Sequence, residues 1–172
     1  MKFLKKIKNF LQRLKTEEAT AVVDATTLLE VKHIRKGKVL SEQTVKDRVV
    51  TTAFVEDLVA ALRGQSGPYE SFNSYKWHAS GTDSTSEEVG DTSLHAEVED
   101  RVEGSQQTGE TDNIYKSVAT IQYTSANVIE EHGLFNSYEG GTLMDRTVFS
   151  GVPVKEDDSI QFTFTIQFNA GG

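Results

Sequence analysis

The residues best suited to chemistry in this chain are three adjacent ionisable side chains, Glu130, Glu131 and His132. Carboxylates beside an imidazole can serve acid–base catalysis or hold a metal ion. Zinc-protease motifs, however, place two histidines one helical turn apart with a glutamate between them. The surrounding sequence favours a strand end, where neighbouring side chains point to opposite faces. Only Glu130 and His132 would then face the same way, so we predict neither a metal site nor a catalytic site here.

The other residues that could take part in catalysis are scattered. His33, His78 and His95 are isolated in the sequence, and their spacing predicts no set of metal ligands. The absence of cysteine excludes disulfides, thiolate ligands and cysteine nucleophiles. The sequence also lacks a serine-hydrolase elbow, a P-loop and a dinucleotide-binding glycine fingerprint. We therefore expect a protein that is not an enzyme and that has no cofactor.

Charge is unevenly distributed along the 172 residues, a length typical of about one domain. Six of the 18 lysines and arginines lie within residues 1–15, so the rest of the chain carries 12 basic residues against 26 acidic ones, a balance of −14. Affinity for nucleic acid comes mainly from neutralising phosphates, so the acidic body is not expected to bind it. No stretch approaches the roughly 20 apolar residues of a membrane span.

A basic amphipathic helix is predicted over residues 1–18, and we call this segment the arm. Its large apolar side chains recur every three or four residues and form one stripe, with lysines on the other side. The stripe consists of Phe3, Leu4, Ile7, Phe10, Leu11 and Leu14, and the lysines that flank it include Lys5, Lys6 and Lys8. We expect the arm to dock on another protein chain. The alternatives are packing on its own domain, contact with a membrane interface and contact with nucleic acid.

Residues 25–172 predict a single mainly β domain, either a β-sandwich or a β-rich α+β fold. Its clearest pattern lies between Ser159 and Phe168, where Ile and Phe alternate strictly with Gln and Thr. Such alternation is typical of a strand with one face in the core. The turn before it is expected to join two neighbouring strands. The other expected elements are a hairpin at 28–40, helices at 47–64 and 91–104, and strands at 75–79, 114–129 and 142–149.

Two segments carry a resemblance to a known group of proteins. They are YKWHASGTDSTSEEVGDTSLHAEVEDR and VIEEHGLFNSYEGGTLMDRTVF, and an alternating strand follows them. The chain resembles tailed-bacteriophage virion proteins that share a Gly-Thr loop, Asp-Thr-x-Leu, Glu-x-Gly-Leu-Phe and Arg-x-x-Phe. The matching positions are Gly81-Thr82, Asp91–Leu94, Glu97, Glu131–Phe135, Gly140–Thr142 and Arg146–Phe149. The resemblance spans residues 37–168, although the second glycine often seen in the Gly-Thr loop is missing.

The resemblance implies a structural protein located in the virion, at the head–tail connection (the neck) or in the tail. It would be present in multiple copies and held through its arm by other virion chains, including copies of itself. A capsid decoration protein is the alternative of the same class. A peripheral membrane-surface module, anchored by the basic helix, is the alternative from another class.

Within this interpretation, five residues are expected to form a structural corner. Gly133 would take a positive φ and turn the chain. Leu134 and Phe135 would fill the end of the domain. Gly140 and Gly141 would form the turn that starts the next strand.

Overall fold

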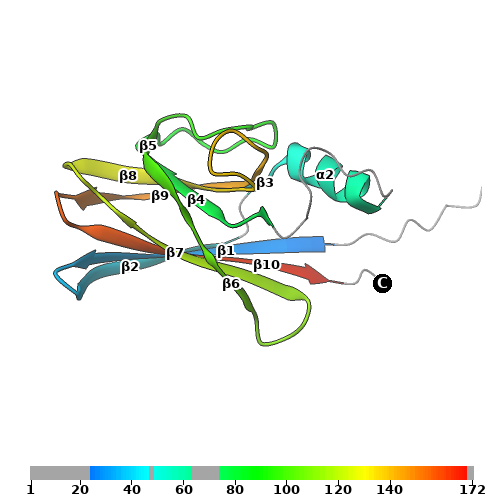
Figure 1. Cartoon of the computed structure of the whole chain (residues 1–172), viewed down its shortest axis with the longest axis horizontal. Coiled ribbons are helices and arrows are strands. Elements are labelled where there is room, and N and C mark those ends of the chain that lie inside the picture. Colours follow the sequence, from blue (N-terminus) through cyan, green and yellow to red (C-terminus); the bar gives the residue numbers. More distant parts are fainter. Residues whose placement is uncertain (1–23, 47–48, 63–73, 170–172) are drawn as a thin grey trace, which may run out of the picture.

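The computed structural model describes residues 24–46, 49–62 and 74–169. Within these ranges the chain is mostly β, with two antiparallel sheets and one short helix (Figure 1). The predicted mainly β class is therefore confirmed. The arm, predicted over residues 1–18, lies outside the described residues.

Each sheet contains five of the described strands. The first sheet has the order β2-β1-β10-β7-β6, with β1 at Asp24–Arg35, β2 at Lys38–Lys46, β6 at Ser105–Thr108, β7 at Ile114–Gln122 and β10 at Ser159–Asn169. The second has the order β3-β9-β8-β4-β5, with β3 at Val49–Val50, β4 at Trp77–Gly81, β5 at Glu97–Glu103, β8 at Asn127–Phe135 and β9 at Leu143–Val154.

Strand β10 supplies much of the core. Its Ile160, Phe162, Phe164 and Ile166 are buried, and the Gln and Thr residues between them are half-buried, so the predicted alternation is confirmed. The ring centre of Phe162 lies 4.7 Å from that of His132 on β8. Because β8 belongs to the other sheet, this contact shows that the two sheets stack face to face around the core.

The predicted hairpin is confirmed, and its strands are longer than expected. Strands β1 and β2 are joined by Lys36 and Gly37, which have φ angles of 49° and 73°. Two central residues with positive φ give the turn twist that suits an antiparallel pair. β1 also pairs with β10, so Asp24 lies opposite Asn169.

The helix expected over residues 47–64 is shorter in the structure. Its first part forms β3, and helix α2 spans Thr52–Leu62 and packs against β9. Thr51 caps the helix, because its hydroxyl oxygen accepts a hydrogen bond of 3.2 Å from the amide of Phe54. This cap places Phe54 in the core.

The helix expected over residues 91–104 is wrong, because residues 97–103 form β5. The expectation relied on the four-residue spacing of Leu94, Val98 and Val102. In the structure Glu99 has a φ of 58°, and the pairing of β4 with β5 shifts register beside it. Residues four apart share a face in a strand as well as in a helix, so Val98 and Val102 both pack against the core from β5 and their spacing did not distinguish the two structures.

The turn before β10 does not join neighbouring strands, because β9 and β10 belong to different sheets. Asp158 holds this crossing in place. Its carboxylate accepts two hydrogen bonds from Arg35, of 2.6 and 2.7 Å, and one of 3.0 Å from the amide of Lys155. It also lies 3.0 Å from the His33 ring. The hydrogen bonds from Arg35, and then those from His33 and Lys155, hold the pKa of Asp158 well below its usual range.

Candidate functional site

A buried arginine on β9, Arg146, lies at the centre of the region where the structural corner was predicted. The guanidinium of Arg146 is fully buried and donates to Glu131 at 2.8 Å, to Asp83 at 3.1 Å and to Asp91 at 3.2 Å. We call these four residues the charged corner. They come from β8, from β9 and from the loop between β4 and β5. The arginine therefore ties that loop to the second sheet.

Glu131 makes the second set of links between sheet and loop. Its carboxylate accepts hydrogen bonds from the amides of His95, at 3.2 Å, and Ala96, at 2.8 Å. Gly81 leaves space for this carboxylate, because a Cβ atom at that position would collide with Glu131 Oε1. A buried charge is tolerated when hydrogen bonds and an opposite charge satisfy it, and Glu131 has both.

The ionisation of the corner is stabilised by its internal contacts. Burial lowers the pKa of Arg146, but the hydrogen bonds and charges of Glu131 and Asp91 outweigh burial, and the pKa is raised overall. Burial raises the pKa of Asp91, but the amide of Glu88 and the charge of Arg146 outweigh burial and lower it. His95, whose side chain is 40% exposed, lies 3.3 Å from both Asp83 and Asp91. The carboxylates thus face partners within the protein.

The apolar side of the corner is closely packed, and the positive φ expected at Gly133 is wrong. Gly133 lies within β8, and residues with positive φ among the described glycines are elsewhere. A Cβ atom there would meet Leu94 at 2.9 Å and Leu143 at 3.0 Å, so the glycine serves close packing. Leu134 and Phe135, which follow it, are buried.

The Gly140–Gly141 pair lies in the loop that leads into β9. Both residues have positive φ, of 59° and 76°. Their surroundings differ, since a Cβ atom on Gly140 would meet nothing within 4 Å. A Cβ atom on Gly141 would collide with Asn136 Oδ1 and lie 2.7 Å from the Ser137 Cβ atom.

This difference predicts unequal effects of two matched substitutions. Gly140→Ala is expected to cost about 1–2 kcal/mol, the strain of a left-handed residue that carries a Cβ atom. Gly141→Ala is expected to cost that strain and about 1–3 kcal/mol more, because it also overpacks the loop. Urea denaturation of the two variants measures both costs. Equal losses would contradict the predicted collision at Gly141.

A second buried polar group lies between the sheets and was missed in the sequence. His78 on β4 and His132 on β8 are fully buried, and His78 Nδ1 lies 3.0 Å from His132 Nε2. His78 Nε2 lies 2.8 Å from the hydroxyl of Ser117 on β7, in the other sheet. Tyr123 and Ser80 form a similar link, 3.0 Å between their hydroxyls. These contacts join the two sheets by hydrogen bonds inside the core.

The contacts of the histidine pair indicate its protonation. His132 Nδ1 is buried and has no hydrogen-bond partner in the described part of the chain. We assign the proton of His132 to Nε2, which donates to His78, and the proton of His78 to Nε2, which donates to Ser117, so that no buried N–H group is left unpaired. Burial lowers the pKa of His78 to about 3 and, with the nearby His78, lowers the pKa of His132 well below its usual value. Both rings are therefore neutral at pH 7.

Neutral buried histidines predict a loss of stability in mild acid. The unfolded chain takes up protons near the ordinary histidine pKa of about 6.5, whereas the folded chain does not. The free energy of unfolding should thus fall by about 1 kcal/mol between pH 7 and pH 6 through these two residues. His132→Leu is expected to remove roughly half of this slope. Urea denaturation at a series of pH values measures it, and an unchanged slope in the variant would contradict a neutral pair.

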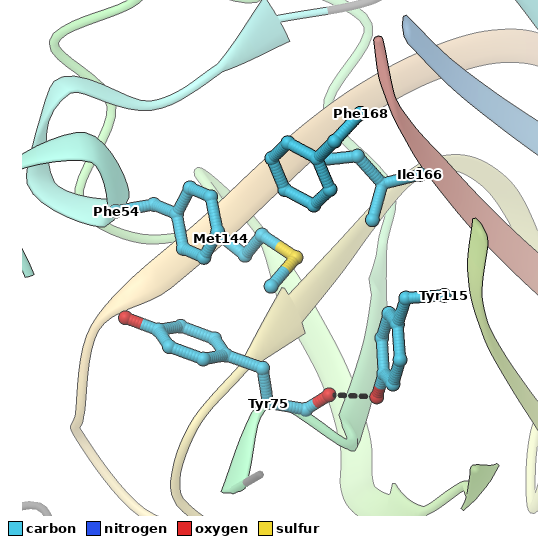
Figure 2. Close-up of a pocket in the computed structure, with 6 residues that line it drawn as sticks. All are labelled: Phe54, Tyr75, Tyr115, Met144, Ile166 and Phe168. Atoms are coloured by element: carbon cyan, nitrogen blue, oxygen red, sulfur yellow. Dashed lines mark hydrogen bonds between the residues drawn. The ribbon is translucent and has the colours of Figure 1, made fainter. Parts of the chain in front are cut away.

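An apolar pocket of about 210 Å³ lies where α2 and the two sheets meet. Its lining residues are Phe54, Tyr75, Tyr115, Met144, Ile166 and Phe168 (Figure 2). The two tyrosine hydroxyls are engaged away from the cavity, since Tyr75 donates to Asp57 at 2.7 Å and Tyr115 donates to the carbonyl of Tyr75. The pocket is partly open to solvent. Its chemistry suits an apolar side chain.

Searches of protein-family models, curated proteins and solved structures found no match to this chain. Within the described ranges, no three or more His, Cys, Asp or Glu residues are grouped so as to hold a metal ion. No described helix has both the length and the apolar character of a membrane span. The interpretation of function therefore rests on the residues themselves.

The structure places the sequence-predicted residues in two groups. Gly133, Leu134 and Phe135 lie on β8 beside the charged corner. Gly140 and Gly141 lie in the loop between β8 and β9. The expected docking residues, all in the arm, lie outside the described residues. The central role of Arg146 was not predicted from the sequence. A signal was present, because Arg146 stands between large apolar residues in the segment LMDRTVF, where a charge needs a buried partner.

Proposed function

We propose that this chain is a non-enzymatic structural protein of a tailed-bacteriophage virion, a β-sandwich assembled in multiple copies through its arm. Its proposed place is the neck or the tail. The observation that carries the proposal is that the two segments of the resemblance meet. Asp91 of the first segment contacts Arg146 of the second, and Leu94 of the first packs beside Gly133 of the second.

This meeting explains why a pattern of short motifs would recur in a group of structural proteins. The motifs consist of glycines, isolated charges and two large apolar residues. In this chain their charges bind one another and their glycines provide space for neighbours. Such a pattern specifies an architecture, which agrees with a structural role.

The buried ionisable groups support the same proposal. Glu131 and Arg146 bind each other at 2.8 Å, and His78 and His132 approach within 3.0 Å. All four are fully buried, so a substrate in solution would not reach them. Their contacts stabilise the stacking of the sheets and the loop that covers the second sheet.

Charge supports assembly through the arm. The arm carries six basic residues and the remaining chain has a balance of −14. Opposite charges raise the rate at which partners meet and help to select the partner. The acidic surface of a neighbouring copy is thus a suitable partner for the arm.

The test is to look for the chain in particles. Cells that carry the gene would be induced, and the released particles would be purified and examined by quantitative mass spectrometry. We expect several copies of the chain per particle, and gold-labelled antibodies should bind at the neck or the tail. Label spread over the head would instead support the decoration alternative. Absence from particles, together with sedimentation on anionic liposomes, would support a membrane-surface module and overturn the proposal.

A further inference from the structure

The apolar pocket lies beside the point where the arm joins the domain. Two of its lining residues, Ile166 and Phe168, are on β10. β10 lies beside β1 (Figure 1). Their pairing places Ala25 opposite Phe168. Asp24, where the described chain begins, therefore lies at the end of the first sheet where the pocket is.

The pocket and the arm have matching chemistry. The pocket holds about 210 Å³ and is lined by aromatic and aliphatic side chains, and Figure 2 shows these side chains arranged around the cavity. A protein cavity of about 150 Å³ with similar lining accommodates a benzene molecule, so one phenylalanine or leucine side chain would fit here. The stripe of the arm offers such side chains at helical spacing, among them Phe3, Ile7 and Phe10.

The sequence of the segment between the arm and the domain favours docking of the arm on a neighbouring copy over docking on its own domain. Residues 19–23 read ATAVV and contain none of the Gly, Pro, Asn or Asp residues that favour turns. Their last residues, Val22 and Val23, favour a continuation of β1 in the extended direction. Five extended residues span up to about 18 Å. To enter the pocket of its own domain the chain would have to reverse at once, whereas an extended segment carries the arm outward.

We propose that the arm of one copy docks its apolar stripe into the pocket of a neighbouring copy. The inference rests on the proposed function, in which the arm joins copies, and it names the receptor of the arm. The contact is heterologous, because the arm of one copy meets a different surface on the next. Repetition of such a contact gives a closed ring or an open filament.

The absence of native cysteine allows a direct test by disulfide cross-linking of the full chain. One variant would carry Phe10→Cys and another Phe168→Cys, and the two would be mixed, oxidised and separated on non-reducing gels. We expect a covalent heterodimer from the mixture, and a ladder of covalent oligomers from a chain with both substitutions. The same experiment with Phe3→Cys and Ile7→Cys covers the other turns of the stripe.

Matched controls distinguish docking from chance collision. Gln12→Cys lies off the stripe of the arm. Val128→Cys replaces an exposed apolar residue near the start of β8, a strand that does not line the pocket. Both controls should cross-link much more slowly. If the chain with both substitutions forms a monomer with an intrachain disulfide, the proposal is overturned, because the arm then occupies the pocket of its own domain. Cross-linking no faster than in the controls would also overturn it.

Failure of this inference can be told apart from failure of the proposed function. If the chain is present in particles but stripe positions do not cross-link to Phe168→Cys, the arm has another receptor and the structural role stands. If the chain is absent from particles but the mixed variants cross-link in solution, the docking stands and the virion role fails.

Discussion

Replacing Arg146 with methionine is expected to destabilise the protein by about 3–5 kcal/mol, the usual result of removing one partner of a buried ion pair. Methionine has a similar length but leaves Glu131 buried without its opposite charge, and it releases Asp83 and Asp91 from the sheet. Urea denaturation should show the loss, and the melting temperature should fall by about 10 °C.

The surface pair of Lys76 and Glu103 is the matched control for this substitution. Both side chains are partly exposed, at 30% and 54%, so Lys76→Met is expected to cost less than about 1 kcal/mol. Adding Glu131→Gln to Arg146→Met should recover part of the stability, because it removes the uncompensated charge. A loss below about 1 kcal/mol for Arg146→Met alone would show that the corner is not held by its charges.

A chain with Ile7→Asp and Phe10→Asp is expected to lose its place in the assembly and to keep a folded domain. The two carboxylates interrupt the apolar stripe. Burial of its six large side chains would contribute about 1.5–3 kcal/mol each, before the cost of association is subtracted. Quantitative mass spectrometry of purified particles should therefore find the variant reduced to background, and its melting temperature should be unchanged. Deletion of residues 1–16 is expected to give the same two results.

Two control variants separate the stripe from the charge of the arm. Gln12→Asp adds a carboxylate to the arm outside the stripe and should be incorporated normally. Replacement of Lys5, Lys6 and Lys8 by glutamine tests the membrane alternative, since lipid binding would depend on these lysines. Unfolding of the stripe variant would indicate that the arm packs on its own domain, and normal incorporation would show that the stripe is not the contact.

Local patterns predicted those elements whose form depends on neighbouring residues. The alternation in β10 identifies its buried face because strand side chains have a period of two. The hairpin of β1 and β2 was predictable because Lys36 and Gly37 stand between two apolar runs. The same reasoning failed for β5, because residues four apart share a face in a strand as well as in a helix, so the spacing of Val98 and Val102 fits both.

The features that were not predicted from the sequence depend on contacts between distant segments. Arg146 meets Asp83 and Asp91, which lie 63 and 55 residues away in the chain. Pairing of the last strand with β1, in place of its neighbour in sequence, is likewise a long-range choice. Local periodicity predicts neither long-range ion pairs nor the pairing of distant strands. The signal in the sequence for the charged corner was therefore a charge inside an apolar strand.

The position of β1 determines how the domain would respond to tension. β1 lies inside the first sheet, with hydrogen-bonded neighbours β2 and β10 on its two sides. A pull applied at Asp24 along the strand acts on both sets of hydrogen bonds in shear, so many bonds must break together before the strand slides out. A pull that separates the two ends of the described chain instead opens the pair of Asp24 and Asn169 first and then peels β1 from β10 one pair at a time. An attachment through the arm would therefore load the domain in its mechanically stronger direction.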